Sequence, residues 1–168
     1  MKHSKTQKMI YTALFAALAC VATMVIHIPI TITQGYINLG DCIVLLAGFM
    51  LGPVYGTIAA GIGSAFADIL LLYAAYAPAT FVIKALMALV AALIYRFPQK
   101  STVRLVLAGI VAELIMVFGY FGFECILYKY ASAALAVPLN SIQALAGIIV
   151  ASVLIKVFSK VDAIKKQF

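Results

Sequence analysis

Charged residues are scarce in this sequence. Only 10% of its residues are Asp, Glu, Lys or Arg, against 66% that are hydrophobic. That balance excludes a soluble globular domain and a disordered chain, and it is typical of a protein that lies in lipid. Acidic residues are rarest, with five against twelve basic ones and a net charge of +7. The basic residues flank apolar runs and are not interleaved with aromatic ones, so nucleic-acid binding is not expected.

Cysteines and enzyme motifs are also few or missing. Cys20, Cys42 and Cys125 are odd in number and form no C-x-x-C motif, so neither a disulfide framework nor a metal site is predicted. The motifs H-E-x-x-H, G-x-S-x-G and G-x-x-x-x-G-K-[ST] do not occur, which excludes a zinc hydrolase, an esterase and a P-loop ATPase. Asp41 and Asp68 lack the surroundings of an aspartic protease dyad. We therefore expect no enzyme and no cofactor.

What the chain does contain is a regular placement of basic residues. Ten of the twelve fall in three clusters, at the start, the middle and the end: Lys2, Lys5 and Lys8; Arg96, Lys100 and Arg104; and Lys156, Lys160, Lys165 and Lys166. Cytoplasmic loops of membrane proteins collect Lys and Arg. All three clusters, and with them both termini, are therefore predicted to be cytoplasmic, so an even number of membrane crossings must separate consecutive clusters.

Prolines, glycines and polar turns divide the apolar chain into six predicted transmembrane helices. Their approximate ranges are 8–28, 41–51, 54–72, 79–95, 103–128 and 138–158, with an outer loop at 30–39. The basic start could also open a signal peptide, but the apolar run 9–30 is long enough to cross a bilayer, so the first helix is predicted to be retained. The fold class is thus an all-α integral membrane bundle of six helices, forming a single domain over 1–168.

Most polar residues within the predicted helices fall in the outer half of the membrane. They are His27, Asn38, Asp41, Asp68, Lys84, Glu124, Lys129, Asn140 and Gln143. Ionisable residues in a bilayer normally face a bundle interior or a water-filled cavity, so we expect a pocket open to the outside. Glu113 alone lies deeper, and it shares one helix face with Tyr120 and Glu124, at i, i+7 and i+11. Asn140 and Gln143, one turn apart, offer neutral donors and acceptors.

Structural roles compete with ligand binding at several of these positions. Asp41 could cap the helix that follows it, where exposed amides favour a carboxylate. Asp68 and Lys84 could form a salt bridge between adjacent helices instead of contacting a ligand. Lys129 is interpreted as an interfacial lysine. The tyrosines at the outer helix ends fit an aromatic belt, although one or two are expected to serve the pocket; they are Tyr73, Tyr76, Tyr128 and Tyr130.

Four segments in the first half of the chain carry a resemblance to a known family: GYINLGD at 35–41, LGPVYG at 51–56, GIGSAFAD at 61–68 and APATFVIK at 77–84. The chain resembles the S components of energy-coupling factor (ECF) vitamin transporters, within the riboflavin-transporter-like branch that includes hydroxymethylpyrimidine and pyridoxine types. This resemblance implies the substrate-capture subunit of an ABC-type importer, without an ATPase site of its own, which binds a vitamin outside the cell and delivers it by toppling. Its partners would be a transmembrane coupling subunit and two ATPase subunits in the bacterial plasma membrane.

The resemblance also implies roles for individual residues. The family's first helix docks on the coupling subunit through an alanine-x-x-x-alanine motif, which Ala13 and Ala17 fit, and its first outer loop, here 30–39, closes over the ligand. Charges of both signs near the predicted pocket favour a neutral or weakly charged aromatic ring, pyridoxine or hydroxymethylpyrimidine first and riboflavin next. The predicted substrate-binding residues are Asn38, Asp41, Asp68, Lys84, Tyr120, Glu124, Asn140 and Gln143.

Two other functions stay open. A lone carboxylate in the middle of a membrane is typical of a proton relay, so the chain could be a proton-coupled secondary transporter that uses Glu113. Uptake by the isolated protein, driven by a proton gradient without ATPases, would identify it. A membrane scaffold that transports nothing would bind no small molecule.

Overall fold

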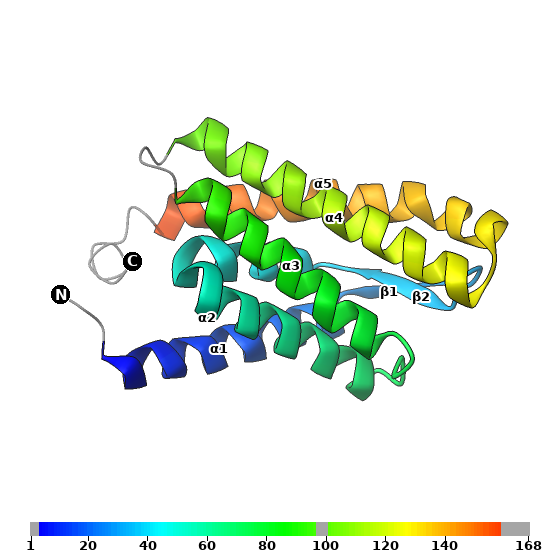
Figure 1. The fold of residues 1–168 in the computed structure, drawn as a ribbon, viewed down its shortest axis with the longest axis horizontal. Coiled ribbons are helices and arrows are strands. Elements are labelled where there is room, and N and C mark those ends of the chain that lie inside the picture. Colours follow the sequence, from blue (N-terminus) through cyan, green and yellow to red (C-terminus); the bar gives the residue numbers. More distant parts are fainter. Residues whose placement is uncertain (1–3, 97–100, 159–168) are drawn as a thin grey trace.

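The structure, a computed structural model, describes residues 4–96 and 101–158. Within them, five helices and one two-stranded sheet follow one another as α1 (Lys5–Val25), β1 (His27–Ile30), β2 (Gly35–Asn38), α2 (Gly40–Leu70), α3 (Ala77–Tyr95), α4 (Thr102–Leu127) and α5 (Tyr130–Phe158). All five helices are long and apolar enough to cross a membrane. They form one elongated bundle (Figure 1).

Helix α2 is broken at Gly52 into a first arm, residues 40–51, and a second arm, residues 53–70. Gly52 has φ 81° and ψ −172°, a conformation open essentially to glycine alone, and Pro53 follows it. The second arm folds back on the first, so that the Ala47 carbonyl lies against Gly56. The sequence predicts this boundary correctly. The predicted count of six spanning helices is not confirmed, because the described residues hold five helices of spanning length and the first arm is too short to span by itself.

A β-hairpin replaces the predicted end of the first helix and the predicted loop at 30–39. Helix α1 ends at Val25, and β1 pairs with β2 in an antiparallel register from His27 opposite Asn38 to Ile30 opposite Gly35. Pro29 cannot donate a helical hydrogen bond and disfavours helical geometry in the residue before it. The β-branched residues around it favour a strand. The outer segment is therefore an ordered hairpin, which lies against α1 and α5 through β2.

The last helix also begins earlier than predicted. Helix α5 starts at Tyr130 and contains Pro138 in its interior, whereas the sequence predicts Pro138 at its start. The alanine-rich segment before Pro138 is a strong helix former, which outweighs the proline. Pro78 does stand in the first turn of α3, as predicted.

The starts of α1 and α4 and the ends of α3 and α5 lie at one end of the bundle, called here the basic end (Figure 1). The described members of the three basic clusters belong to these helix ends: Lys5, Lys8, Arg96, Arg104 and Lys156. Lys2, Lys100, Lys160, Lys165 and Lys166 lie outside the described residues. The opposite end carries the β-hairpin and is called the hairpin end. Which side of the membrane each end faces stays a prediction.

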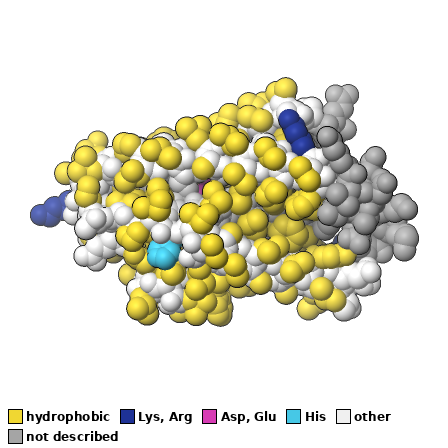
Figure 2. Space-filling view, turned by 180° about the vertical axis from the view of Figure 1, so that it is seen from behind, with side chains coloured by type: hydrophobic (Ala, Val, Ile, Leu, Met, Phe, Trp, Pro, Cys, Tyr) yellow, Lys and Arg dark blue, Asp and Glu magenta, His cyan; other side chains and the backbone are white. Residues whose placement is uncertain are grey.

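Apolar and charged side chains are distributed as a bilayer requires. Large apolar side chains such as Val54, Phe118 and Ile142 are exposed on the outside of the bundle, and hydrophobic side chains are spread over the described part of the face shown in Figure 2. An apolar surface of this extent is typical of a lipid-facing protein. The interior, by contrast, buries charged residues, among them Asp41 and Lys84. Charged residues away from the helix ends, such as Asp41, Asp68, Lys84, Glu113 and Glu124, thus face inward.

Candidate functional site

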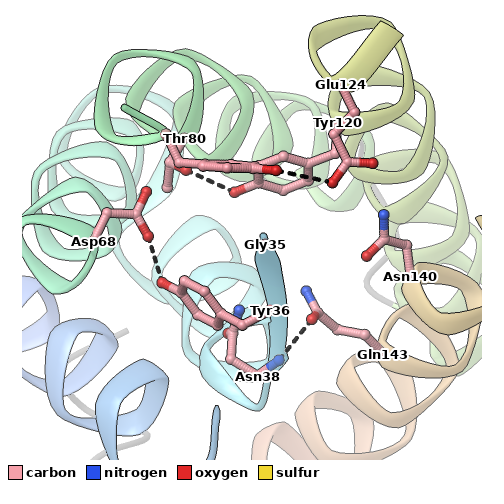
Figure 3. Close-up of a pocket in the computed structure, with 10 residues that line it drawn as sticks. Gly35, Tyr36, Asn38, Asp68, Thr80, Tyr120, Glu124, Asn140 and Gln143 are labelled. Carbon is pink, nitrogen blue, oxygen red and sulfur yellow. Dashed lines mark hydrogen bonds between the residues drawn. The ribbon is translucent and has the colours of Figure 1, made fainter. Parts of the chain in front are cut away.

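A pocket lies at the hairpin end of the bundle (Figure 3). It is lined by Gly35, Tyr36, Asn38, Asp68, Tyr76, Thr80, Tyr120, Glu124, Asn140 and Gln143. These residues come from β2, the second arm of α2, the connection to α3, and helices α3, α4 and α5. The lining side chains leave a cavity of only about 20 Å³. The pocket is therefore formed but nearly closed by its own side chains.

Six of the eight predicted binding residues line this pocket: Asn38, Asp68, Tyr120, Glu124, Asn140 and Gln143. Helical spacing explains much of this convergence, because residues three or four positions apart lie on one helix face. Tyr120 and Glu124 are paired in this way on α4, and Asn140 and Gln143 on α5. Asp41 and Lys84 are not among the lining residues; they lie next to the pocket, where Asp41 contacts Gln143.

Four lining residues are absent from the predicted set: Gly35, Tyr36, Tyr76 and Thr80. A Cβ atom on Gly35 would lie 3.1 Å from the Tyr76 hydroxyl and 3.3 Å from Glu124 Oε1, so glycine makes room there for both groups. Sequence signals for these residues exist. Three of them fall in the segments 35–41 and 77–84 that carry the family resemblance, and Tyr76 is one of the tyrosines considered for the pocket.

Tyr36 connects the hairpin to the second arm of α2. Its hydroxyl donates a hydrogen bond to Asp68 Oδ1. Burial, together with the negative charge of Asp68, raises the pKa of the Tyr36 hydroxyl. The group therefore stays protonated and remains a donor. On its other side the Tyr36 ring packs against Tyr73, with ring centroids 4.8 Å apart.

Tyr76 makes the second connection between the hairpin and the helices. Its hydroxyl donates to the Thr33 carbonyl oxygen at 2.6 Å and lies 3.3 Å from Glu124 Oε1. Burial and the charge of Glu124 raise the pKa of Tyr76, so its hydroxyl also stays protonated. Because the phenol has a single proton, the shorter bond to Thr33 leaves Glu124 weakly bonded. Beside this pair, the Thr80 and Tyr120 hydroxyls share a hydrogen bond of 2.9 Å.

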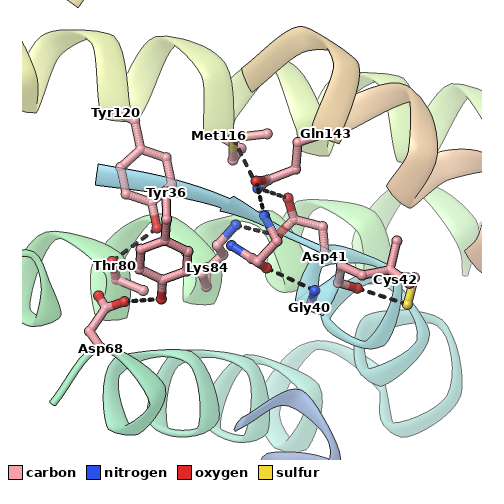
Figure 4. A network of polar contacts seen from close by, with 12 residues as sticks. Tyr36, Gly40, Asp41, Cys42, Asp68, Thr80, Lys84, Met116, Tyr120 and Gln143 are labelled. Atoms are coloured by element: carbon pink, nitrogen blue, oxygen red, sulfur yellow. Dashed lines mark hydrogen bonds and ion pairs between the residues drawn. The ribbon is translucent and has the colours of Figure 1, made fainter. Parts of the chain in front are cut away.

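Of the two roles considered for Asp68 and Lys84, the salt bridge between them is not formed, because Lys84 Nζ pairs with Asp41 Oδ1 (Figure 4). Both side chains are almost fully buried, at 2% and 0% exposure. Gln143 Nε2 donates to the other Asp41 oxygen at 2.5 Å, and Gln143 Oε1 accepts the Asn38 backbone N–H at 2.7 Å. A continuous polar chain thus joins the hairpin to the buried ion pair.

The interpretation of Asp41 as a helix cap is also wrong. The N-cap of α2 is Leu39, which makes no side-chain capping bond, and Asp41 stands in the first helical turn. A carboxylate is favoured there by the exposed amides. Its side chain, however, is directed to Lys84 and Gln143.

Glu113 stands on α4 about two helical turns before Tyr120, on the side of the basic end, and does not line the pocket. It is buried, and within residues 4–96 and 101–158 neither of its carboxylate oxygens has a hydrogen-bond partner. A Cβ atom on Gly147 would lie 2.7 Å from Glu113 Oε1 and 3.1 Å from Asp41 Cβ, which places Glu113 beside the ion pair. The charge of Lys84 acts on both carboxylates.

Other predicted residues lie outside the pocket. His27 and Lys129 are exposed, and neither belongs to the lining, so His27 does not contribute a charge to it. On α1, Ala13 and Ala17 are exposed while the Ala16 backbone packs against Gly63 of α2. Within the described part of the chain, no group of three or more His, Cys, Asp or Glu residues could hold a metal ion.

Comparisons with known proteins agree with this architecture. The sequence model of a family described as "ECF-type riboflavin transporter, S component" matches residues 3–160. A protein of Pyrococcus woesei, described as "Uncharacterized protein in gap 3'region", is 35% identical over 133 residues, which cover 77% of this chain and 86% of that protein. The solved structure described as "Structure and mechanism of the S component of a bacterial ECF transporter" is similar with a TM-score of 0.72, over 91% of this chain and 95% of that one, at 24% identity. At that identity the structural likeness supports the fold alone.

Proposed function

The chain belongs to the family of S components of ECF-type riboflavin transporters, and on that premise we propose that it captures a small aromatic vitamin or vitamin precursor with high affinity. The family's members are substrate-binding subunits of membrane transporters, not enzymes. Pyridoxine and hydroxymethylpyrimidine are the favoured ligands and riboflavin is the next. The ligand is bound from outside the cell and delivered by toppling of the subunit in the membrane.

The observation that carries this proposal is the convergence of polar side chains on one pocket in an otherwise apolar bundle. Buried polar groups in a membrane protein are costly unless they serve a site or a partner. Here, buried Asp68, Glu124, Asn140 and Gln143 come from three helices and line the same pocket. Tyrosine rings from β2 and α4 provide flat apolar surfaces for an aromatic ring.

The β-hairpin acts as the lid of this pocket. Its bonds through Tyr36 to Asp68 and through Thr33 to Tyr76 hold it against the helices. Because the space inside is only large enough for about one water molecule, a vitamin enters when these bonds open. The same bonds, or bonds to the ligand in their place, close the hairpin over the bound molecule.

Transport requires partners that this chain does not supply. We propose that it docks on a transmembrane coupling subunit bound to two ATPase subunits, in the bacterial plasma membrane. The exposed Ala13 and Ala17 on α1 are the proposed docking face, since small side chains let helices approach closely in lipid.

The test is to purify the protein in detergent, denature it and identify released small molecules by mass spectrometry. Titration calorimetry with pyridoxine, hydroxymethylpyrimidine and riboflavin then measures each affinity. We expect a vitamin-like heterocycle to be released or bound with a dissociation constant at or below the micromolar range. If no small molecule is released and none of the three binds, the protein is not a capture subunit, and a scaffold becomes the better interpretation.

The second candidate function, proton-coupled secondary transport, is favoured by one observation: Glu113 is buried and its oxygens have no hydrogen-bond partner among the described residues. Such a carboxylate is typical of a proton site. In proteoliposomes without ATPases, a proton gradient should then drive vitamin uptake, and Glu113→Gln should abolish it. For a capture subunit, the same liposomes show binding without accumulation, and Glu113→Gln binds like the wild type.

A further inference from the structure

The described interior of the bundle contains more negative than positive groups. Its buried ionisable side chains of Asp, Glu, Lys and Arg are four carboxylates, Asp41, Asp68, Glu113 and Glu124, and one ammonium, Lys84. This is the reverse of the whole chain, which carries a net charge of +7. A buried carboxylate without a partner is costly, because water no longer solvates it.

Lys84 cannot balance the two carboxylates of the pocket. Its single ammonium group is paired with Asp41, its charge also acts on Glu113 and Asp68, and it does not line the pocket. Among the described residues, no Lys, Arg or His lines the pocket at all. Asp68 and Glu124 are therefore the charged groups that a ligand meets there.

Each of these two carboxylates has one oxygen without a hydrogen-bond partner among the described residues: Asp68 Oδ2 and Glu124 Oε2. The other oxygens accept from Tyr36 and, weakly, from Tyr76. In Figure 3 Asp68 and Glu124 lie on opposite sides of the group of lining residues. The lining thus contains two carboxylates from different helices, each with one unsatisfied oxygen and each at most 2% exposed.

A ligand that offered only acceptors would leave both oxygens unsatisfied and add repulsion. A ligand with a donor at each end would satisfy them, and a positive charge on one donor would replace part of the missing cation. The tyrosine faces in the lining favour a flat ring that carries such a charge.

We propose, on the basis of the capture function argued above, that the ligand is a cationic nitrogen heterocycle that donates a hydrogen bond to Asp68 at one end and to Glu124 at the other. This changes the ligand class favoured by the sequence alone, a neutral or weakly charged ring. The reason for the change is that Lys84, the one buried cation of the described residues, is paired with Asp41 and does not line the pocket.

Two matched pairs of probes test whether the pocket prefers a positively charged ligand. The first pair is hydroxymethylpyrimidine and its aminomethyl counterpart; the second is pyridoxine and pyridoxamine. Within each pair the ring is the same, and an alcohol is replaced by an amine that is protonated at neutral pH. By titration calorimetry in detergent, we expect the amine of at least one pair to bind about tenfold more tightly or better than its alcohol.

Two variants assign this preference to the carboxylates. Asp68→Asn and Glu124→Gln keep the shape of each side chain and remove its charge, so either should reduce the preference for the amine severalfold. Glu113→Gln removes a buried carboxylate outside the pocket and should leave the preference unchanged. Circular dichroism confirms that each variant is folded, and the comparison within each pair on the wild-type protein does not depend on any variant.

The outcomes separate this inference from the proposed function. If the alcohols, or riboflavin, bind at least as tightly as the amines, or if the ligand released from the purified protein is neutral or anionic, the charge inference is overturned while capture stands. If neither probes nor riboflavin bind and no ligand is released, the capture function fails, and the inference fails with it. A released cationic heterocycle supports both.

Discussion

At the basic end, Lys5, Lys8 and Arg96 are exposed at helix ends, whereas in the pocket region Asp41 and Lys84 are buried inside the bundle. An exposed charge costs little to keep, and at the ends of membrane helices it influences how the chain inserts. A buried charge is costly unless it has a partner. The net charge of the chain, +7, therefore reflects the exposed basic end. The described interior holds more acidic than basic side chains. Substitutions at the two ends should therefore differ in the size of their effects.

The largest effect is expected from Lys84→Met, which leaves Asp41 buried without a cation. Breaking one partner of a buried ion pair costs about 3–5 kcal/mol in the free energy of unfolding. Thermal unfolding in detergent should show a strongly lowered midpoint or no folded protein. Lys5→Met at the basic end is the control and should stay within about 0.5 kcal/mol of the wild type.

The double variant Lys84→Met with Asp41→Asn removes both charges and should recover much of the lost stability. If Lys84→Met alone is as stable as the wild type, the pair does not stabilise the fold, and the contrast between the two regions breaks down.

The next effect concerns the break in α2. Gly52→Ala places a side chain in a backbone conformation that costs about 1–3 kcal/mol for other residues. The new Cβ would also overlap the Arg96 guanidinium. The control is Gly122→Ala on α4, where a Cβ meets nothing within 4 Å. Unfolding midpoints should fall for the first variant and be kept or rise for the second. Equal midpoints would mean that the break tolerates a side chain.

A smaller effect is expected from Gln143→Ala, which removes the link between Asn38 on the hairpin and Asp41 in the interior. Losing these bonds should weaken ligand binding by about 1–3 kcal/mol, ten- to a hundredfold in dissociation constant. Amide hydrogen exchange at Asn38 should also accelerate. Ser141→Ala is the matched control, since the Ser141 hydroxyl donates to the Val137 carbonyl on its own helix and Ser141 does not line the pocket. Unchanged affinity for Gln143→Ala would exclude this link from binding.

For the isolated protein, the smallest effect is expected from replacing Ala13 and Ala17 together with leucine. Both are exposed, so stability and ligand affinity should stay at wild-type values. Co-purification with the coupling subunit should be lost, because bulk on this face keeps helices apart. The control replaces Ala74 and Ala131, also exposed, in the same way. Docking would be located elsewhere if the first pair of substitutions left the complex intact.

The sequence predicts which residues line the pocket better than it predicts which buried side chains pair with one another. Helical periodicity is a local property, so it groups Tyr120 with Glu124 and Asn140 with Gln143 correctly. Salt-bridge partners are not local. Asp68 is nearer than Asp41 to Lys84 along the chain, which favours Asp68 as its partner, but the folded α2 brings Asp41 to Lys84.

The sequence does not predict the β-hairpin, and the reason is different. Only one polar residue, His27, separates the apolar sequence of α1 from the rest of the first strand, so composition alone extends the helix into it. The signals that could have revealed it are Pro29 and the β-branched residues on both sides of it, which favour an extended chain. Pro138 shows the opposite error. The sequence predicts a helix start at this proline, but Pro138 lies inside α5.

The break at Gly52 also determines how far Asp41 and Asp68 lie from each other along the bundle. An uninterrupted helix of the 31 residues of α2 would be about 46 Å long, well beyond a hydrocarbon core of about 30 Å, and Asp41 and Asp68 would be about 40 Å apart. Because α2 folds back at Gly52, the depth of residues on both arms can be measured from that break. Asp41 stands about 16 Å along the first and Asp68 about 24 Å along the second. This difference of one to two helical turns explains why one carboxylate lines the pocket while the other lies beneath it.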